Sequence, residues 1–296
     1  MMGTNYHALR RSLRDVPRAA LLAFVALCAV ASSGWADDGY RLVWSDEFDR
    51  DGVPNPEDWT YEHGFVRNEE LQWYGPQNAY CRGGRLVIEA RREQVVNPRY
   101  DAESRRWNRR RAEAEYTSAS VTTRKRKQWL YGRFVMRGRI DTRPGLWPAF
   151  WTLGTARGWP GCGEIDIMEY YDGKLLANAC WLGRRGQPDW DATEKPLASF
   201  DDPDWSNEFH DWRMDWDRDY VRLYVDDQLL NEIDVEAAVN SGADDVRPFR
   251  EPQYLILNLA VGGTRGGDPA ATEFPARFEI DFVRVYQQTE SAVESE

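Results

Sequence analysis

Apolar residues recur at every second position in this chain, and this period constrains the fold more than any other feature. The pattern runs through residues 133–140, 211–217 and 220–225. It returns near the C-terminus, where Phe278, Ile280 and Phe282 alternate with acidic residues. Because successive side chains of a β-strand point to opposite faces, each run predicts a strand with one apolar face and one polar face.

Long amphipathic helices are absent from the pattern, and turns rich in Gly, Pro and Asp separate the predicted strands. Many antiparallel strands without crossover helices predict an all-β fold, in which two antiparallel sheets pack as a sandwich or jelly roll. Residues 86–88 and 254–257 are apolar throughout and predict strands covered on both sides. A sandwich of this length commonly forms one domain, so we expect no internal boundary in residues 37–290.

Charge and composition exclude several kinds of partner. The 38 basic and 49 acidic residues give a net charge of −11, which argues against recognition of nucleic acid through its phosphates. No apolar run is long enough for a membrane-spanning helix. The 14 tryptophans indicate either a very aromatic core or a surface that stacks on flat ligand faces.

The N-terminus has the layout of a cleavable export signal. Four arginines precede an apolar run at 19–31, and small residues stand just before Asp37. We expect residues 1–36 to be a signal peptide that is cleaved near Ala36, which makes the protein secreted, either periplasmic or extracellular. The paired Arg10 and Arg11 leave a twin-arginine signal open. We expect residues 291–296 to be a polar tail and the protein to be a monomer.

Three cysteines follow the predicted signal peptide: Cys81, Cys162 and Cys180. No Cys-x-x-Cys pair exists and only His63 and His210 remain among the histidines, so the sequence does not support a zinc or copper centre. Cys162 and Cys180 could face each other across a hairpin and form a disulfide in an oxidising compartment. The alternative, which we favour, is that all three are small buried apolar residues.

Residues 91–114 break the alternating pattern. Trp107 stands there among five arginines: Arg105, Arg106, Arg109, Arg110 and Arg111. One interpretation is an anion-binding loop for a sulfated or acidic polymer. The other, which we favour, is a solvated insertion between two strands, balanced by nearby glutamates.

Three acids, Glu164, Asp166 and Glu169, stand within one apolar strand. Unpaired carboxylates are costly in a core, so we expect these three to line a cleft. In a regular strand Glu164 and Asp166 share a face, about 6.6 Å apart along the chain, and Glu169 points to the other face. A β-bulge would consume one residue and return Glu169 to the face of the other two.

Such a bulge would bring the carboxyl groups of Glu164 and Glu169 within roughly 5–5.5 Å, the separation found in retaining glycosidases. In those enzymes one carboxylate attacks the anomeric carbon and the other protonates the departing oxygen. Crowding three acids also splits their pKa values and leaves one protonated near neutral pH. The spacing alone leaves open an exposed acidic strand or a cation site.

Residues 164–169, E-I-D-I-M-E, closely resemble the E-x-D-x-x-E signature of glycoside hydrolase family 16, the laminarinase-like β-glucanases. Other segments resemble the family in the same order: LVWSDEF at 42–48, NEELQWY at 68–74, YTSA at 116–119, GLWPAFW at 145–151, LILNLAVGG at 255–263 and DFVRVY at 281–286. The resemblance implies a concanavalin-like β-jelly roll with a sugar cleft across its concave face. It also implies an endo-acting β-glycanase that needs no cofactor for catalysis.

The resemblance assigns roles to single residues. It implies that Glu164 is the nucleophile, that Glu169 is the acid/base, and that Asp166 hydrogen-bonds the nucleophile. It implies substrate binding by polar and aromatic residues of the cleft: Asn68, Glu70, Trp73, Trp147, Trp151 and Trp181. For the indoles at 147 and 151, filling the core is the alternative. His210 also matches a family position, and we expect a structural hydrogen bond there.

Two departures from the family bear on the substrate. Family laminarinases carry an H-G-T-x-H-like stretch after the catalytic hairpin, whereas residues 177–181 here are A-N-A-C-W. Glu69 stands where the family has a second asparagine. We expect hydrolysis of β-1,3-glucan, with a β-galactan of the agar, porphyran or carrageenan type as the competing polysaccharide. A non-catalytic polysaccharide-binding module is the alternative, and the presence of all three acids argues against it.

The resemblance further implies a structural calcium ion on the convex face, remote from catalysis. The matching positions are Glu47 and Gly84, through backbone carbonyls, and Asp281, through its carboxylate. Ligation by oxygen alone suits calcium rather than zinc.

A calcium ion bound only to the folded protein stabilises it in proportion to its excess over the dissociation constant. We therefore expect added calcium to raise the melting temperature of the chelator-treated protein, and Asp281→Ala to abolish that response. Thermal unfolding followed by circular dichroism measures both. An identical melting temperature with and without calcium would remove the site.

Overall fold

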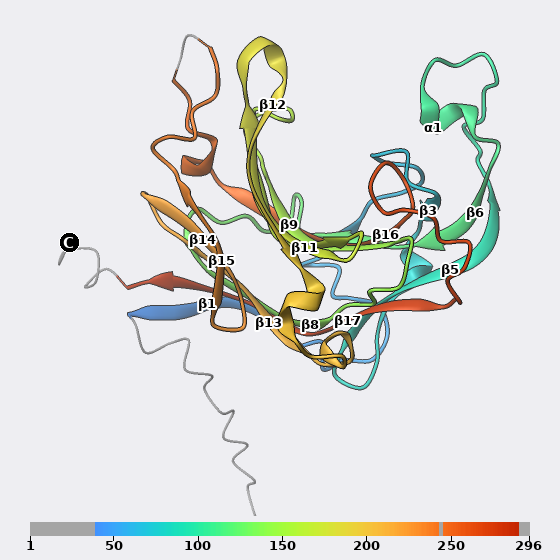
Figure 1. Cartoon of the computed structure of the whole chain (residues 1–296), viewed down its shortest axis with the longest axis horizontal. Helices are drawn as coiled ribbons and strands as arrows, with labels where there is room; N and C mark the ends of the chain where they lie inside the picture. Colours follow the sequence, from blue (N-terminus) through green and yellow to red (C-terminus); the bar gives the residue numbers. More distant parts are fainter. Residues whose placement is uncertain (1–38, 243–244, 290–296) are drawn as a thin grey trace, which may run out of the picture. The chain divides into compact units, whose positions relative to one another are not determined.

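The computed structural model describes residues 39–242 and 245–289 (Figure 1). These residues form two β-sheets around one large hydrophobic core, so the predicted all-β sandwich is confirmed. The predicted signal peptide, 1–36, and the predicted tail, 291–296, lie outside the described residues. Within the described ranges α1 (Trp107–Arg110) is the only α-helix, and no helix there is long and apolar enough to span a membrane.

The larger sheet has ten strands in the order β15-β14-β13-β8-β17-β5-β6-β3, with β1 beside β17 and β4 beside β5. Its pairs are antiparallel except β3 and β6, a short parallel pair that an alternating pattern cannot reveal. The bounds are β1 (Tyr40–Asp46), β3 (Gln72–Tyr74), β4 (Ala79–Cys81), β5 (Leu86–Val96), β6 (Glu113–Ser118), β8 (Gly132–Arg139), β13 (His210–Trp216), β14 (Tyr220–Val225), β15 (Gln228–Asp234) and β17 (Ala276–Gln288).

The smaller sheet has seven antiparallel strands in the order β12-β11-β10-β9-β16-β7-β2. The bounds are β2 (Thr60–Tyr61), β7 (Ser120–Thr122), β9 (Leu146–Gly154), β10 (Glu164–Tyr171), β11 (Lys174–Leu182), β12 (Pro188–Pro196) and β16 (Gln253–Val261). β10, which carries the three acids, lies between β9 and β11 and is paired on both edges. Its backbone is therefore among the best fixed in the sheet.

Strand β13 shows how the alternating pattern builds the larger sheet. Trp212, Met214 and Trp216 are buried in the core, and the polar residues between them lie half-buried on the opposite face. Burial of such large side chains is the main favourable term in folding. Arg133 departs from the pattern because its side chain is buried, and its Nε lies 2.7 Å from the carboxylate of Asp215.

For β17 the alternating pattern is wrong about one residue. It places Phe282 on the core face with Phe278 and Ile280, but the pairing of β17 with β8 shifts between Ile280 and Phe282. Beyond this bulge Val283 and Val285 enter the core, and Phe282 joins a separate small cluster. A bulge reverses the inside–outside order of every residue that follows it.

The three positions proposed for calcium converge at this bulge. Residue 281 lies where β1 ends and β5 begins along β17, next to Glu47 and Gly84. Arg284 donates hydrogen bonds to both carboxylate oxygens of Glu47. The backbone carbonyl of Glu47 is therefore the group that is left to bind an ion. The Asp281 side chain is 43% exposed, with Arg137 Nε 3.7 Å away.

No group of three or more His, Cys, Asp or Glu side chains within the described ranges could hold a metal. An ion at the β17 bulge would therefore depend on the backbone carbonyls of Glu47 and Gly84 beside the single carboxylate of Asp281, which is the ligand set that the resemblance implies. The arrangement fits calcium, and we keep this site as a proposal.

The cysteines and His210, for which the sequence predicts no catalytic role, have structural roles. All three described cysteines are free and buried, which confirms the favoured alternative. Cys180 stands opposite Glu164 in the sheet, and burial raises the pKa of its thiol. The expected structural hydrogen bonds of His210 are confirmed: Nδ1 lies 2.9 Å from Asp226 Oδ2 and Nε2 lies 2.8 Å from the carbonyl oxygen of Trp205.

Candidate active site

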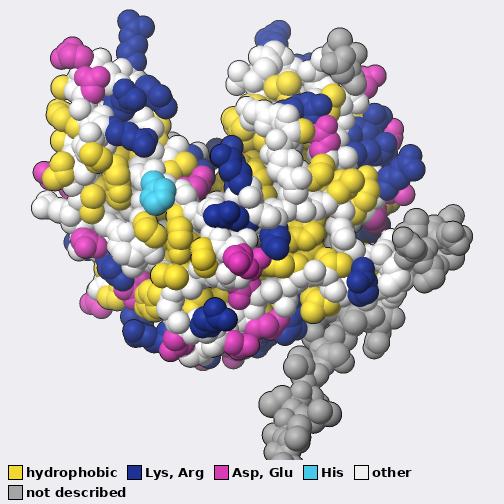
Figure 2. Space-filling model, turned by 180° about the vertical axis from the view of Figure 1, so that it is seen from behind, with side chains coloured by type: hydrophobic (Ala, Val, Ile, Leu, Met, Phe, Trp, Pro, Cys, Tyr) yellow, Lys and Arg dark blue, Asp and Glu magenta, His cyan; other side chains and the backbone are white. Residues whose placement is uncertain are grey.

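A deep cleft opens on the face of the smaller sheet that points away from the core. Figure 2 shows the hollow between two raised walls, and its volume is about 710 Å³. The lining comes mainly from β9, β10, β11 and β12, with further residues from β16 and from three loops. It comprises Arg67, Asn68, Glu70, Trp147, Ala149, Trp151, Leu153, Trp159, Glu164, Asp166, Glu169, Tyr171, Leu176, Asn178, Trp190, Ala192, Glu194, Asn258, Thr264 and Arg265.

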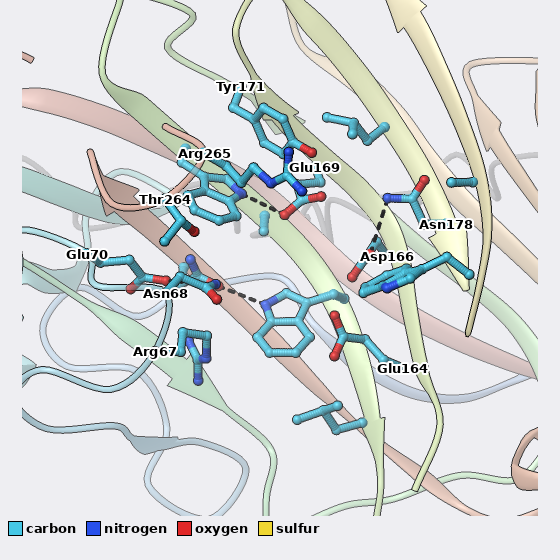
Figure 3. A pocket seen from close by; sticks show the side chains of 18 of the residues that line it. Arg67, Asn68, Glu70, Glu164, Asp166, Glu169, Tyr171, Asn178, Thr264 and Arg265 are labelled. Carbon is cyan, nitrogen blue, oxygen red and sulfur yellow. Dashed lines mark hydrogen bonds between the residues drawn. The ribbon is translucent and has the colours of Figure 1, made fainter. Parts of the chain in front are cut away.

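The predicted β-bulge in β10 is confirmed. From Asp166 to Glu169 the strand advances three residues, whereas its partner β11 advances two. Two consecutive residues, Ile167 and Met168, consequently point into the core. The acid that follows them returns to the cleft, where it joins Asp166 and Glu164. In Figure 3 the three carboxyl groups point into the same space.

Indole N–H groups hold the two outer carboxylates. Trp159 Nε1 donates a hydrogen bond to Glu164 Oε2 at 2.7 Å, and Trp147 Nε1 donates one to Glu169 Oε1 at 2.6 Å. Trp159 comes from the loop before β10, and Trp147 comes from the neighbouring strand β9. Each acid is therefore oriented by a group with no charge and a single donor.

The central acid is held by a residue of the neighbouring strand β11 and by Glu164 on its own strand. Asp166 is buried, and Asn178 Nδ2 on β11 donates to its Oδ2 at 3.4 Å (Figure 3). The carboxyl groups of Asp166 and Glu164 also hydrogen-bond each other. Because an ionised carboxylate cannot donate, one of these two acids must carry a proton when that bond exists.

Burial and mutual repulsion set the charge of the three acids. Burial raises the pKa of Glu164 to about 7, although the Trp159 N–H and the positive charge of Arg67 oppose this rise. Burial also raises the pKa of Glu169 to about 7, and the negative charge of Glu164 adds to it. For Asp166, burial and both neighbouring glutamates raise the pKa well above its ordinary value.

The segment 67–70 faces these acids across the cleft (Figure 3). Arg67 forms an ion pair with Glu62, and its guanidinium lies 4.9 Å from the centre of the Trp151 ring. Asn68 Nδ2 donates to Glu70 Oε1 at 3.3 Å, and burial raises the pKa of Glu70. Residues 68 and 69 have φ values of 53° and 52°, in the left-handed region where asparagine is more readily tolerated than most residues.

The Arg-rich insertion supports this segment from behind. Arg111 donates hydrogen bonds to the main-chain carbonyls of Glu69 and Glu70. Its guanidinium lies 5.2 Å from the Trp107 ring centre and 5.4 Å from that of Phe65. The predicted insertion between two strands is confirmed, since β5 ends at 96 and β6 begins at 113. Its anion-binding interpretation stays a prediction.

Two of the predicted substrate-binding indoles lie outside the cleft. Trp73 packs edge-on against Phe65 with ring centres 5.5 Å apart, and Trp181 packs edge-on against Phe249 at 6.2 Å. Strand alternation explains the second case: Asn178 faces the cleft, so a residue three positions later on β11 faces the core. The motif match could not register this, because it carries no information about side-chain direction.

The other predicted substrate-binding residues do line the cleft, but the two indoles among them are buried. Trp147 and Trp151 are each 6% exposed, and Trp151 Nε1 donates to Asn258 Oδ1 at 2.7 Å. The two indoles form the floor of the cleft. Each is held by a hydrogen bond from the N–H at the edge of its ring.

Sequence reasoning missed several cleft residues. They are Arg67, Trp159, Tyr171, Asn178, Trp190, Glu194, Asn258, Thr264 and Arg265. Two of these residues could have been predicted from the sequence. Beyond the bulge, Tyr171 lies on the same face of the strand as Glu169, and pairing in the hairpin places Asn178 opposite Asp166. Residues on the loops and on the edge strand β12 leave no local signal.

Comparison with known proteins agrees with this geometry. Residues 72–284 match the family described as glycosyl hydrolases family 16. The chain is 37% identical over 289 residues to a β-glucanase of Rhodothermus marinus, covering 91% of this chain and 94% of that one. The solved laminarinase catalytic domain of Thermotoga maritima matches with a TM-score of 0.71 and 36% identity, covering 86% of this chain and 100% of that one.

A further solved structure comes from work on endo-acting O-glycanases with which human gut bacteria initiate mucin breakdown. It matches with a TM-score of 0.78 and 34% identity, covering 87% of this chain and 94% of that one. Fold and cleft together define a carbohydrate-active β-sandwich. The chain belongs to glycoside hydrolase family 16, and its class of activity is that of an endo-β-glycanase acting on polysaccharide.

The raised pKa of Glu169 has a consequence for stability. The folded protein keeps this proton up to about pH 7, whereas an unfolded chain releases it near its ordinary value of 4.5. Between these values the folded state binds more protons, so the free energy of unfolding falls as pH rises through that window. The loss contributed by a shift of this size is at most about 3 kcal/mol.

We therefore expect Glu169→Gln to raise the melting temperature at pH 8, where the wild-type carboxylate is ionised, and to leave it nearly unchanged at pH 4. Calorimetry at both values measures the difference. Glu57→Gln, on an exposed turn, is the matched control and should show no such pH-dependent gain. A Glu169→Gln protein less stable than the wild type at pH 8 would contradict the burial argument.

Proposed function

We propose that this protein is a retaining endo-β-glycanase in which Glu164 is the nucleophile and Glu169 is the general acid/base. The observation that carries the proposal is the β10 bulge, which puts both acids on one face of the cleft. Acids on one face of one strand favour the short carboxyl separation of retaining enzymes, roughly 5–5.5 Å, over the wider separation of inverting ones.

The surroundings of the two glutamates favour Glu164 as the nucleophile and Glu169 as the acid/base. Glu164 receives the Trp159 N–H, a hydrogen bond from Asp166 and the field of Arg67, all of which favour its carboxylate form. Glu169 has the negative charge of Glu164 beside it, which favours its protonated form. In the proposed reactive state Asp166 and Glu169 are protonated, and the one negative charge of the cluster is on Glu164.

The reaction then follows from these charges. The Glu164 carboxylate attacks the anomeric carbon while the Glu169 proton passes to the departing glycosidic oxygen, which leaves a covalent glycosyl–enzyme ester. Glu169, now ionised, takes a proton from water, which attacks the same carbon and releases Glu164. Two displacements at one carbon restore the β-configuration.

Asp166 acts as a positioning residue in this scheme, because its hydroxyl can hydrogen-bond the nucleophile and Asn178 holds its other side. We propose that Asn68 and Glu70 bind sugar hydroxyls opposite the acids, and that Trp147 and Trp151 form the floor beneath the reacting sugar. All four line the cleft.

The substrate that we propose is β-1,3-glucan. The β-glucanase and the laminarinase domain described above support it, with 37% and 36% identity over most of the chain. The second candidate is a β-galactoside-containing glycan of the O-glycan or galactan type. The higher TM-score of the O-glycanase structure favours it, and so does the histidine-free strand β11.

A non-catalytic polysaccharide-binding module would have no use for three carboxyl groups held at raised pKa in one cleft, because burial of unpaired acids costs stability. We also propose that the enzyme acts outside the cytoplasm after cleavage near Ala36, and as a monomer. N-terminal sequencing of the exported protein and its mass in solution test these two points.

Replacement of the two glutamates should separate their roles. Glu164→Gln and Glu169→Gln should each lower kcat on polysaccharide by at least about 10²–10⁴-fold, since each removes one chemical step. On an aryl glycoside whose leaving group needs no proton, the release of the aryl group should recover in Glu169→Gln and stay lost in Glu164→Gln. Burst kinetics measure this, with Glu57→Gln as the control. Turnover like that of the wild type in either variant would refute the assignment.

The substrate is tested by reducing-end release from laminarin, lichenan, agarose, carrageenan and mucin O-glycans, with early NMR spectra of the products. We expect laminarin to be cleaved fastest and the first product to be the β-anomer. Faster cleavage of agarose, carrageenan or mucin glycans would replace the glucan by the second candidate. An α-anomer appearing first would refute the double displacement.

A further inference from the structure

The edge strand β12 forms one wall of the cleft. Its residues Trp190, Ala192 and Glu194 all line the cavity, since alternate side chains of a strand share a face. In Figure 1 this strand rises on the side of the smaller sheet away from α1. Neither the family motifs nor the proposed chemistry uses any of these residues.

Trp190 differs from the other tryptophans of the described residues. Each of those has a hydrogen bond or a contact with an aromatic ring or a cation, and most are buried in the core. In the same set of residues Trp190 has none of these contacts, and it is 43% exposed. Its indole therefore presents a free apolar surface to the cleft.

Sheet register fixes where this surface lies. Trp190 is paired with Cys180 on β11, and Cys180 is paired with Glu164 on β10. The indole thus lies in the same row as the proposed nucleophile but two strands away, about 10 Å at the usual strand spacing. A sugar bound at Glu164 cannot cover it, so Trp190 is available to another ring of the same glycan.

The wall that carries Trp190 is held in place. Strand β12 pairs with β11 along nine residues, from Pro188 to Pro196. Asn231 on β15 donates hydrogen bonds to Asp191 Oδ1 and to the carbonyl oxygen of Ala177, both at 3.0 Å. A fixed platform costs little ordering entropy when a ligand binds to it.

We propose that the cleft face of β12 is a distal sugar subsite in which Trp190 stacks on the apolar face of a pyranose ring. An indole offers a large rigid surface that suits such a ring. The subsite makes Trp190 a specificity-determining residue that favours long glycan chains over short ones. This inference rests on the proposed glycanase function.

The first test compares kcat/KM on laminarin-type oligosaccharides of increasing length in the wild type, Trp190→Ala and Trp190→Phe. We expect Trp190→Ala to lose about 5- to 30-fold on long chains, mainly through a higher KM, and distinctly less on the shortest substrate. Trp190→Phe should keep most of the activity. Tyr220→Ala, an exposed aromatic on β14, is the matched control. An equal loss at all lengths, or no loss on long chains, would overturn the subsite.

A second test separates this inference from the proposed function. In the Glu164→Gln background, calorimetry measures binding of long oligosaccharides from laminarin and from mucin glycans with and without Trp190→Ala. Weaker binding on removal of the indole supports the subsite even if the wild-type protein hydrolyses neither glycan, in which case the proposed function alone fails. Unchanged affinity of every glycan that binds overturns the subsite, whatever the enzyme cleaves.

Discussion

One extra residue in strand β10 organises this molecule. Without the bulge, Glu169 would point into the hydrophobic core. Either its carboxyl group would be buried without a partner or the packing of the two sheets would be disrupted. With the bulge, two consecutive apolar residues, Ile167 and Met168, fill the core and three acids share the cleft. The bulge thus allows apolar side chains to be buried in the core and also brings the three acids together in the cleft.

The clustered acids cost stability, and the surrounding structure limits that cost. Central strands on both sides fix β10, so the acids cannot move apart without breaking the sheet. The indole N–H of Trp159 and of Trp147 each satisfies one carboxylate without adding a charge. The raised pKa values of all three acids favour their protonated forms, and partial neutralisation of the cluster lowers the remaining repulsion. Burial, together with the repulsion between the acids, therefore raises their pKa values.

The rim of the cleft is made by parts of the chain that lie far apart in sequence. Arg111 fastens the insertion between β5 and β6 to the segment that carries Asn68 and Glu70. On the other side the edge strand β12, anchored by Asn231, contributes Trp190 to the cleft lining. These walls, rather than the acids, are expected to decide which glycan the cleft accepts.

Much of the fold and of the catalytic centre could be predicted from the sequence. Alternation over strands such as β13 and β14 determined the all-β class, since a period of two has one structural meaning. The spacing of Glu164, Asp166 and Glu169 predicted a bulge if all three acids line one cleft, and the family resemblance favoured that cleft over an exposed acidic strand or a cation site. These conclusions depend on local periodicity and on the price of burying charge, both of which are readable along the chain.

The tertiary structure decided the rest. The bulge in β17 moved Phe282 out of the core, strand alternation on β11 turned Trp181 away from the cleft, and Trp73 packs against Phe65 instead of lining it. The partners of the acids, such as Trp159 and Asn178, were decided by a loop and by hairpin register. A sequence pattern gives the order of residues along a strand, but the face that each one takes depends on pairing with strands from elsewhere in the chain, and this pairing exists only in the folded protein.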